Sequence, residues 1–215
     1  MKTKHPFVYS FREPRCGGTH VIESLKNIYA DTYLGKKQLE YLDRHELDML
    51  KTIKPEDNAI VIRCDRKNLV DHFFSTYFLR YLDGFTNVRF HENFSIPKLL
   101  HGLNARVIIP EYEVDSYIRG RLRIHVDFVK YTKNLQVQTI YYEDWHKPFD
   151  IPSLGLYNIE LSKTFQYTKK LPDYKRTVFL NYDEVVTWIK KYKNDYLKKY
   201  NLAELFKHWT SNPSR

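Results

Sequence analysis

Cysteine and glycine are scarce in this chain of 215 residues, which has two cysteines and seven glycines. Two cysteines without a Cys-x-x-Cys spacing exclude a four-cysteine zinc site. The histidines show no paired spacing, so no metal site is predicted. No apolar run is long enough to cross a bilayer, and the first residues do not resemble a signal peptide. These absences predict a reduced, cytoplasmic or intracellular setting.

Two further patterns are missing. The sequence has no Gly-x-x-x-x-Gly-Lys-Ser/Thr run, which disfavours an ordinary ATPase or GTPase. It also has no block of consecutive positive charges of the kind that forms a nucleic-acid-binding arm, so nucleic acid is an unlikely partner. The length and the 42% hydrophobic content suit a single domain over 1–215, with 83–110 as a loop or insert.

Positive charge and aromatic side chains are abundant. The formal net charge is +9, and residues 166–215 hold 11 lysines and arginines against 5 acidic residues. This basic C-terminal part favours anionic partners such as nucleotides or phosphorylated and sulfated substrates, although a solvated lysine-rich face gives the same pattern.

The chain also has 18 tyrosines and 13 phenylalanines. The rings Phe73, Phe74, Tyr77 and Phe78 are expected in the core rather than on a nucleotide base.

The start of the chain combines a strand, a glycine turn and a helix. Residues 6–11 are aromatic or β-branched and predict a strand, and the apolar spacing over 21–28 predicts a helix. Between them Gly17 and Gly18 allow the backbone to approach a ligand closely. This order aims backbone N–H groups and a positive helix end at one point, which is how proteins hold phosphate. A tight turn without a ligand is the alternative.

Strands and helices alternate along the rest of the chain. The expected helices are 35–53, 69–82 (stopped by Gly84), 112–132 and 185–200 (with a capping box at 181–184), and the expected strands are 59–63 and 136–142. This alternation predicts an α/β fold whose parallel sheet has 6–11 and 59–63 side by side in its centre, with helices on both faces. Ligands bind beyond the carboxyl ends of such strands. That placement brings together 15–19, 63–68 and 142–145.

Four segments in the same order resemble the sulfotransferases. The loop Pro14-Arg-Cys-Gly-Gly-Thr-His20 resembles their Pro-Lys-Ser-Gly-Thr-Thr-Trp loop, with Arg in place of Lys and Cys in place of Ser. The segment 59–75 resembles their strand, arginine and serine-bearing helix. Tyr141-Tyr-Glu-Asp-Trp145 resembles their Tyr-Glu-Asp-Leu element, and 169–185 resembles their basic loop and late helix. The resemblance implies a three-layer sandwich around a parallel sheet, the P-loop NTPase-like sulfotransferase fold.

The resemblance also implies a ligand and its contacts. The donor would be 3′-phosphoadenosine 5′-phosphosulfate (PAPS), used without a metal. Its phosphosulfate would lie in the first loop, on Arg15, Cys16, Gly17, Gly18, Thr19 and His20. Its 3′-phosphate would contact Arg66 and Ser75, with Arg63 as the alternative arginine and Lys169 and Lys170 as additional cations.

The resemblance implies a sulfuryl transfer in which Arg15 stabilises the leaving phosphate. The base that takes the acceptor proton is expected among Glu40, His45 and Glu46, the candidates between the first helix and the second core strand. The excess of positive charge favours a polar acceptor such as a saccharide, through a hydroxyl or an amine. The alternative is a non-catalytic relative that serves as a structural or binding module of a larger assembly, which leaves an oligomer or an assembly partner open.

Overall fold

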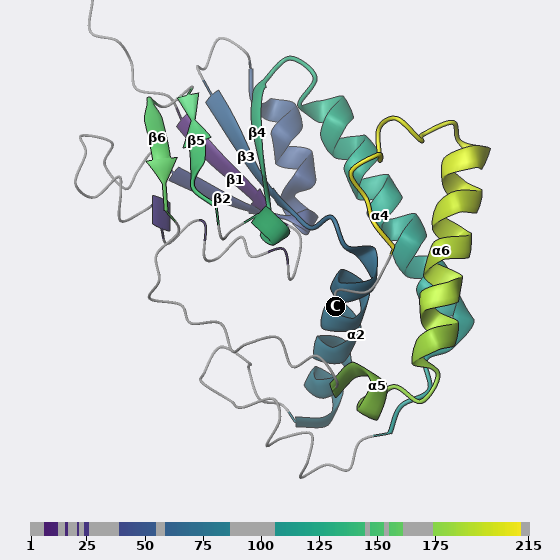
Figure 1. The fold of residues 1–215 in the computed structure, drawn as a ribbon. Helices are drawn as coiled ribbons and strands as arrows, with labels where there is room; N and C mark the ends of the chain where they lie inside the picture. The colour runs from purple at the N-terminus through teal and green to yellow at the C-terminus, as the bar shows by residue number, and fades with distance from the viewer. Residues whose placement is uncertain are drawn as a thin grey trace, which may run out of the picture. The chain divides into compact units, whose positions relative to one another are not determined.

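The computed structural model describes residues 7–12, 16, 21, 24–25, 39–54, 59–86, 106–144, 147–152, 155–160 and 174–211. They form a mixed α/β structure (Figure 1). The chain divides into two compact units. The sheet unit comprises residues 1–67 and 122–165, and the helical unit comprises residues 68–121 and 166–215.

The sheet unit is built on four parallel strands. These are β1 (Phe7–Arg12), β2 (Leu39–Asp43), β3 (Ala59–Asp65) and β4 (Gln136–Tyr141). Their order is β2-β1-β3-β4, and each neighbouring pair is parallel. The predicted central pairing is confirmed, because β1 and β3 lie side by side in the middle of the sheet. A second, antiparallel pair consists of β5 (Phe149–Ile151) and β6 (Leu156–Ile159).

Side chains alternate between the two faces of the sheet because successive residues of a strand point in opposite directions. On one face Val8 and Ile62 pack with Val21 and Leu25 and with the β5–β6 pair. On the other face Phe11 packs with the 3₁₀ helix η2 (Arg44–Thr52) and with Phe128 of α4 (Glu111–Tyr131). Residues 122–131 of α4 belong to this unit. The sheet unit therefore has a buried apolar layer on each face of β1 and β3.

The helix expected over 35–53 is wrong for residues 39–43, but residues 44–52 are helical, as a 3₁₀ helix. Residues 39–43 form the edge strand β2, which pairs with β1 from Val8–Leu39 to Arg12–Asp43. The 3₁₀ helix η2 follows, and its buried residues Leu47 and Leu50 are three apart, which matches the three residues per turn of that helix. The apolar spacing was thus real, but it belonged to two elements rather than one.

The helical unit contains α2 (Leu69–Thr86), residues 111–121 of α4, α5 (Tyr174–Val178) and α6 (Tyr182–Lys199). Its core is aromatic, since the ring of Phe74 lies 5.0 Å from that of Phe179 and 4.7 Å from that of Tyr182. The expectation that the α2 rings are core residues is confirmed for Phe73, Phe74 and Phe78. Gly84 does not stop α2, which continues to Thr86.

The capping box predicted at 181–184 is wrong. Asn181 is the N-cap residue of α6, but its side chain makes no capping hydrogen bond. Instead it accepts a hydrogen bond from the N–H of Ile109 at 3.0 Å and donates one to the Ile109 carbonyl at 2.8 Å. The amide side chain therefore acts like a strand residue and extends the short parallel bridge between Val107 and Phe179. None of the described helices is both long and apolar enough to span a membrane.

Candidate functional site

The candidate site lies at the carboxyl edge of the sheet. Because β1–β4 are all parallel, their last residues Arg12, Asp43, Asp65 and Tyr141 lie along one edge. The chain goes from β1 to β2 on one side and returns to β3 on the other, so the strand order reverses between β1 and β3. In open parallel sheets this reversal point is where ligands bind. The residues that directly follow β1 and β3 are therefore the first candidates.

The loop after β1 is only partly described. Arg15, Gly17, Gly18, Thr19 and His20 lie outside the described residues. Cys16 is fully buried and belongs to the same apolar cluster as Val21, Leu25 and Cys64. Its side chain therefore lies in the core of the sheet unit.

Arg63, the alternative arginine for the 3′-phosphate, is buried in the interior of the sheet unit. Its guanidinium lies 3.2 Å from the Asp65 carboxylate, and the two side chains are only 3% and 1% exposed. It also lies over the ring of Phe128, 4.6 Å from the ring centroid. The Asp65 carboxylate further accepts the backbone N–H of Arg66 at 2.7 Å and lies 3.9 Å from Nδ1 of His125. These contacts give Arg63 and Asp65 a structural role beneath the edge.

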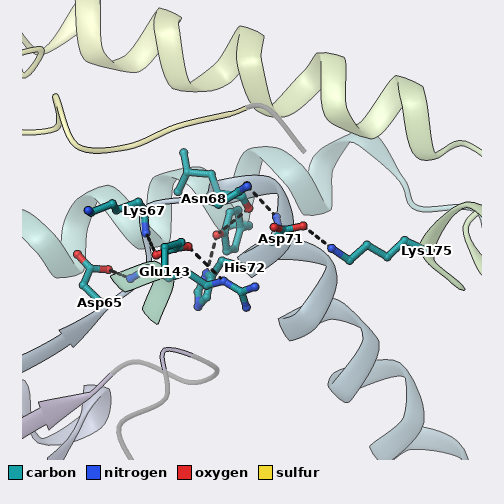
Figure 2. A network of polar contacts seen from close by, with 10 residues as sticks. Asp65, Lys67, Asn68, Asp71, His72, Glu143 and Lys175 are labelled. Carbon is teal, nitrogen blue, oxygen red and sulfur yellow. Dashed lines mark hydrogen bonds and ion pairs between the residues drawn. The ribbon is translucent and has the colours of Figure 1, made fainter. Parts of the chain in front are cut away.

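Arg66 and Lys67 follow β3 and meet the acidic pair that follows β4. Nε of Arg66 lies 3.6 Å from one carboxylate oxygen of Glu143, and the Lys67 N–H donates to the other oxygen at 2.9 Å. Nζ of Lys67 lies 2.6 Å from the Asp144 carboxylate. Figure 2 shows Glu143 directed toward Lys67. The expectation that 63–68 and 142–145 lie together is confirmed for these four residues.

Two tyrosines complete this edge cluster, which consists of Arg66, Lys67, Glu143 and Asp144 with the rings of Tyr141 and Tyr142. The guanidinium of Arg66 lies 4.4 Å from the centroid of the Tyr142 ring, and Nζ of Lys67 lies 4.6 Å from that of Tyr141. Burial raises the pKa of Tyr141, and the nearby Asp65 carboxylate adds to this effect. The Tyr141 hydroxyl therefore stays neutral at physiological pH, and the ring acts as a platform for a cation.

The first turn of α2 carries a second polar group of residues, within the helical unit. The side chain of Asn68 accepts the Asp71 N–H at 3.1 Å and so caps α2. The Asp71 carboxylate pairs with Lys175 of α5, a contact drawn in Figure 2. His72 is buried, with Nδ1 2.7 Å from the Tyr117 hydroxyl. Ser75 lies one turn further along α2 and is half-buried.

The remaining candidates are spread along the chain. Glu40 lies within β2, whereas His45 and Glu46 follow the carboxyl end of that strand in η2, where Glu46 is exposed. Lys169 and Lys170 lie outside the described residues. Sequence reasoning did not single out Lys67 or Lys175. The signal for Lys67 was a basic pair after the predicted strand 59–63 and an acidic pair after the predicted strand 136–142, because the carboxyl ends of parallel strands meet at one edge of a sheet.

Comparisons of the chain with protein-family models, curated proteins and solved structures gave no match.

Proposed function

We propose that the chain is a sulfotransferase that uses PAPS as donor and transfers its sulfuryl group to a hydroxyl or amine of a polar acceptor such as a saccharide. One observation carries the proposal. The loop that resembles the PAPS-binding loop follows β1, and β1 lies beside β3, which is followed by Arg66. A donor that spans these two strand ends would meet both groups that the resemblance requires. The three-layer, P-loop NTPase-like architecture and an intracellular setting belong to the same proposal.

The proposed reaction needs three kinds of group. An acceptor oxygen or nitrogen attacks the sulfur, the bond from sulfur to the bridging phosphate oxygen breaks, and 3′,5′-adenosine bisphosphate leaves. Arg15 and the N–H groups of the glycine turn stabilise the charge that grows on the leaving phosphate. Arg66 recognises the 3′-phosphate, because a guanidinium fork matches a phosphate group.

The base takes the proton that the acceptor releases. Among the three candidates, His45 and Glu46 fit better than Glu40. Both follow the carboxyl end of β2, next to β1 at the edge where the donor loop begins, whereas Glu40 is three residues back within the strand. A base has to lie within hydrogen-bond reach of the acceptor group.

A non-catalytic binding or structural module is the second candidate. The observation that favours it is the engagement of Arg66 and Lys67 by Glu143 and Asp144, since such contacts would also serve a purely structural edge. Measured turnover separates the two candidates.

The test is sulfuryl transfer from labelled PAPS to a panel of sugars, glycolipids and phenols. We expect transfer to polar acceptors, and expect Arg66→Ala to weaken binding of 3′,5′-adenosine bisphosphate by about tenfold or more while leaving AMP binding nearly unchanged. Arg123→Ala is the matched control, because that arginine is 85% exposed on α4 in the same unit. Transfer to phenols alone would contradict the polar acceptor. Unchanged bisphosphate affinity in Arg66→Ala would contradict the role of Arg66.

A further inference from the structure

The Glu143 carboxylate contacts the residues after β3 in the way that a bound anion would. One carboxylate oxygen accepts the Lys67 N–H at 2.9 Å, and the other faces Nε of Arg66 at 3.6 Å. A cationic side chain and a backbone N–H that converge on two oxygens of one group are also what a phosphate receives in proteins. The carboxylate of Glu143 thus occupies donors suited to a phosphate.

The geometry of this contact would allow a phosphate to replace the Glu143 carboxylate. A separation of 3.6 Å is longer than a hydrogen bond, so the attraction between Glu143 and Arg66 is weaker than a charge-assisted contact of ordinary length. The Arg66 side chain is 9% exposed and that of Glu143 26%, so the carboxylate can move toward solvent while the guanidinium stays in place over Tyr142. A phosphate of higher charge that approached to hydrogen-bond distance would gain more from Arg66 than Glu143 does.

We propose that Glu143 competes with the phosphate monoester of the ligand for Arg66 and the Lys67 N–H, and thereby sets the affinity and selectivity of this site. The inference rests on the proposed function for the identity of the ligand. Binding exchanges one anion for another at the same donors. A strong, doubly charged phosphate displaces the carboxylate, whereas singly charged anions do not, so the edge selects against weak anions.

The test compares the unchanged chain with Glu143→Gln by calorimetry, with 3′,5′-adenosine bisphosphate and with inorganic phosphate as separate probes. Glutamine keeps the shape and the oxygen that accepts from Lys67 but removes the competing charge. We expect about tenfold tighter binding of both probes. Asp144→Asn is the matched control, since it removes one charge from the more exposed pair with Lys67, and its affinity should change less than about threefold.

The direction of the change separates competition from a merely structural role, because loss of a structural residue would weaken binding. Equal or weaker binding of both probes in Glu143→Gln overturns the inference, even where the unchanged chain binds the bisphosphate and the proposed function stands. Tighter phosphate binding without any bisphosphate binding supports competition and contradicts the PAPS site. Should Glu143→Gln not fold, the Lys67 amide resonance of the unchanged chain should shift on addition of phosphate, and an unmoved resonance overturns the inference.

Discussion

Replacement of Asp65 by asparagine tests the buried charges beneath the candidate site. The asparagine oxygen can still accept the Arg66 N–H, so the substitution removes the charge and keeps that hydrogen bond. The Arg63 guanidinium, which lies 3.2 Å from the Asp65 carboxylate in the unchanged chain, would then lose this ion pair. The Arg63 side chain is only 3% exposed. Removal of one partner of a buried ion pair costs about 3–5 kcal/mol, because the other charge stays buried and uncompensated. For a chain of this size the melting temperature should fall by roughly 6–20 °C.

The assay is thermal and urea unfolding followed by circular dichroism, with the double variant Arg63→Met with Asp65→Asn as the companion. Methionine removes the buried charge while keeping an apolar side chain against Phe128, so the double variant should regain part of the lost stability. A loss below about 1 kcal/mol in Asp65→Asn, in the range of surface pairs, would refute the buried pair. A double variant less stable than Asp65→Asn would refute the explanation by uncompensated charge.

Two further predictions concern catalysis and pH. Arg15→Ala should lower turnover by about tenfold or more while changing donor affinity much less, because the charge on the leaving phosphate grows in the transition state. Steady-state kinetics measures the turnover, and calorimetry measures the donor affinity. Turnover within a factor of about two of that of the unchanged chain would mean that Arg15 only binds the donor. In the helical unit the Tyr192 hydroxyl donates to the Glu111 carboxylate at 2.7 Å, which raises the pKa of Tyr192 to about 12. The pKa of Tyr192 in the folded chain lies above its unfolded value of about 10, so the hydrogen bond stabilises the fold fully below pH 10 and this stabilisation is lost as the pH rises through 12. The free energy of unfolding, measured over that pH range, should therefore fall in the unchanged chain. It should fall less in Tyr192→Phe, which lacks the hydroxyl.

The central strands could be predicted from the sequence because their signal is local. Residues 59–63 are apolar and followed by a helix, and α4 has a regular apolar spacing over five turns. The edge strand β2 could not be predicted in this way. Its leucines also fit a helical spacing, and only the pairing of Leu39 to Asp43 with β1 decides between the two.

The candidate site was predictable in place but not in its contacts. The rule that ligands bind at the carboxyl ends of parallel strands led to the segments after β1, β3 and β4. Whether Arg63 or Arg66 faces the edge depends on which side of β3 each residue lies and on what packs there. The ion pair with Asp65 and the ring of Phe128 settle this for Arg63, and both depend on tertiary packing. The role of Asn181 was missed for the same reason, since its partner Ile109 is far away in the sequence.

Calorimetric titration of the unchanged chain with 3′,5′-adenosine bisphosphate and with AMP tests the central claim most directly. The two nucleotides differ by the 3′-phosphate that Arg66 is proposed to bind. We predict that the bisphosphate binds at least about tenfold more tightly than AMP, because a charge-assisted phosphate contact is worth that difference. Equal affinity for the two nucleotides, or no binding of either, would contradict a PAPS site at the carboxyl edge of this sheet.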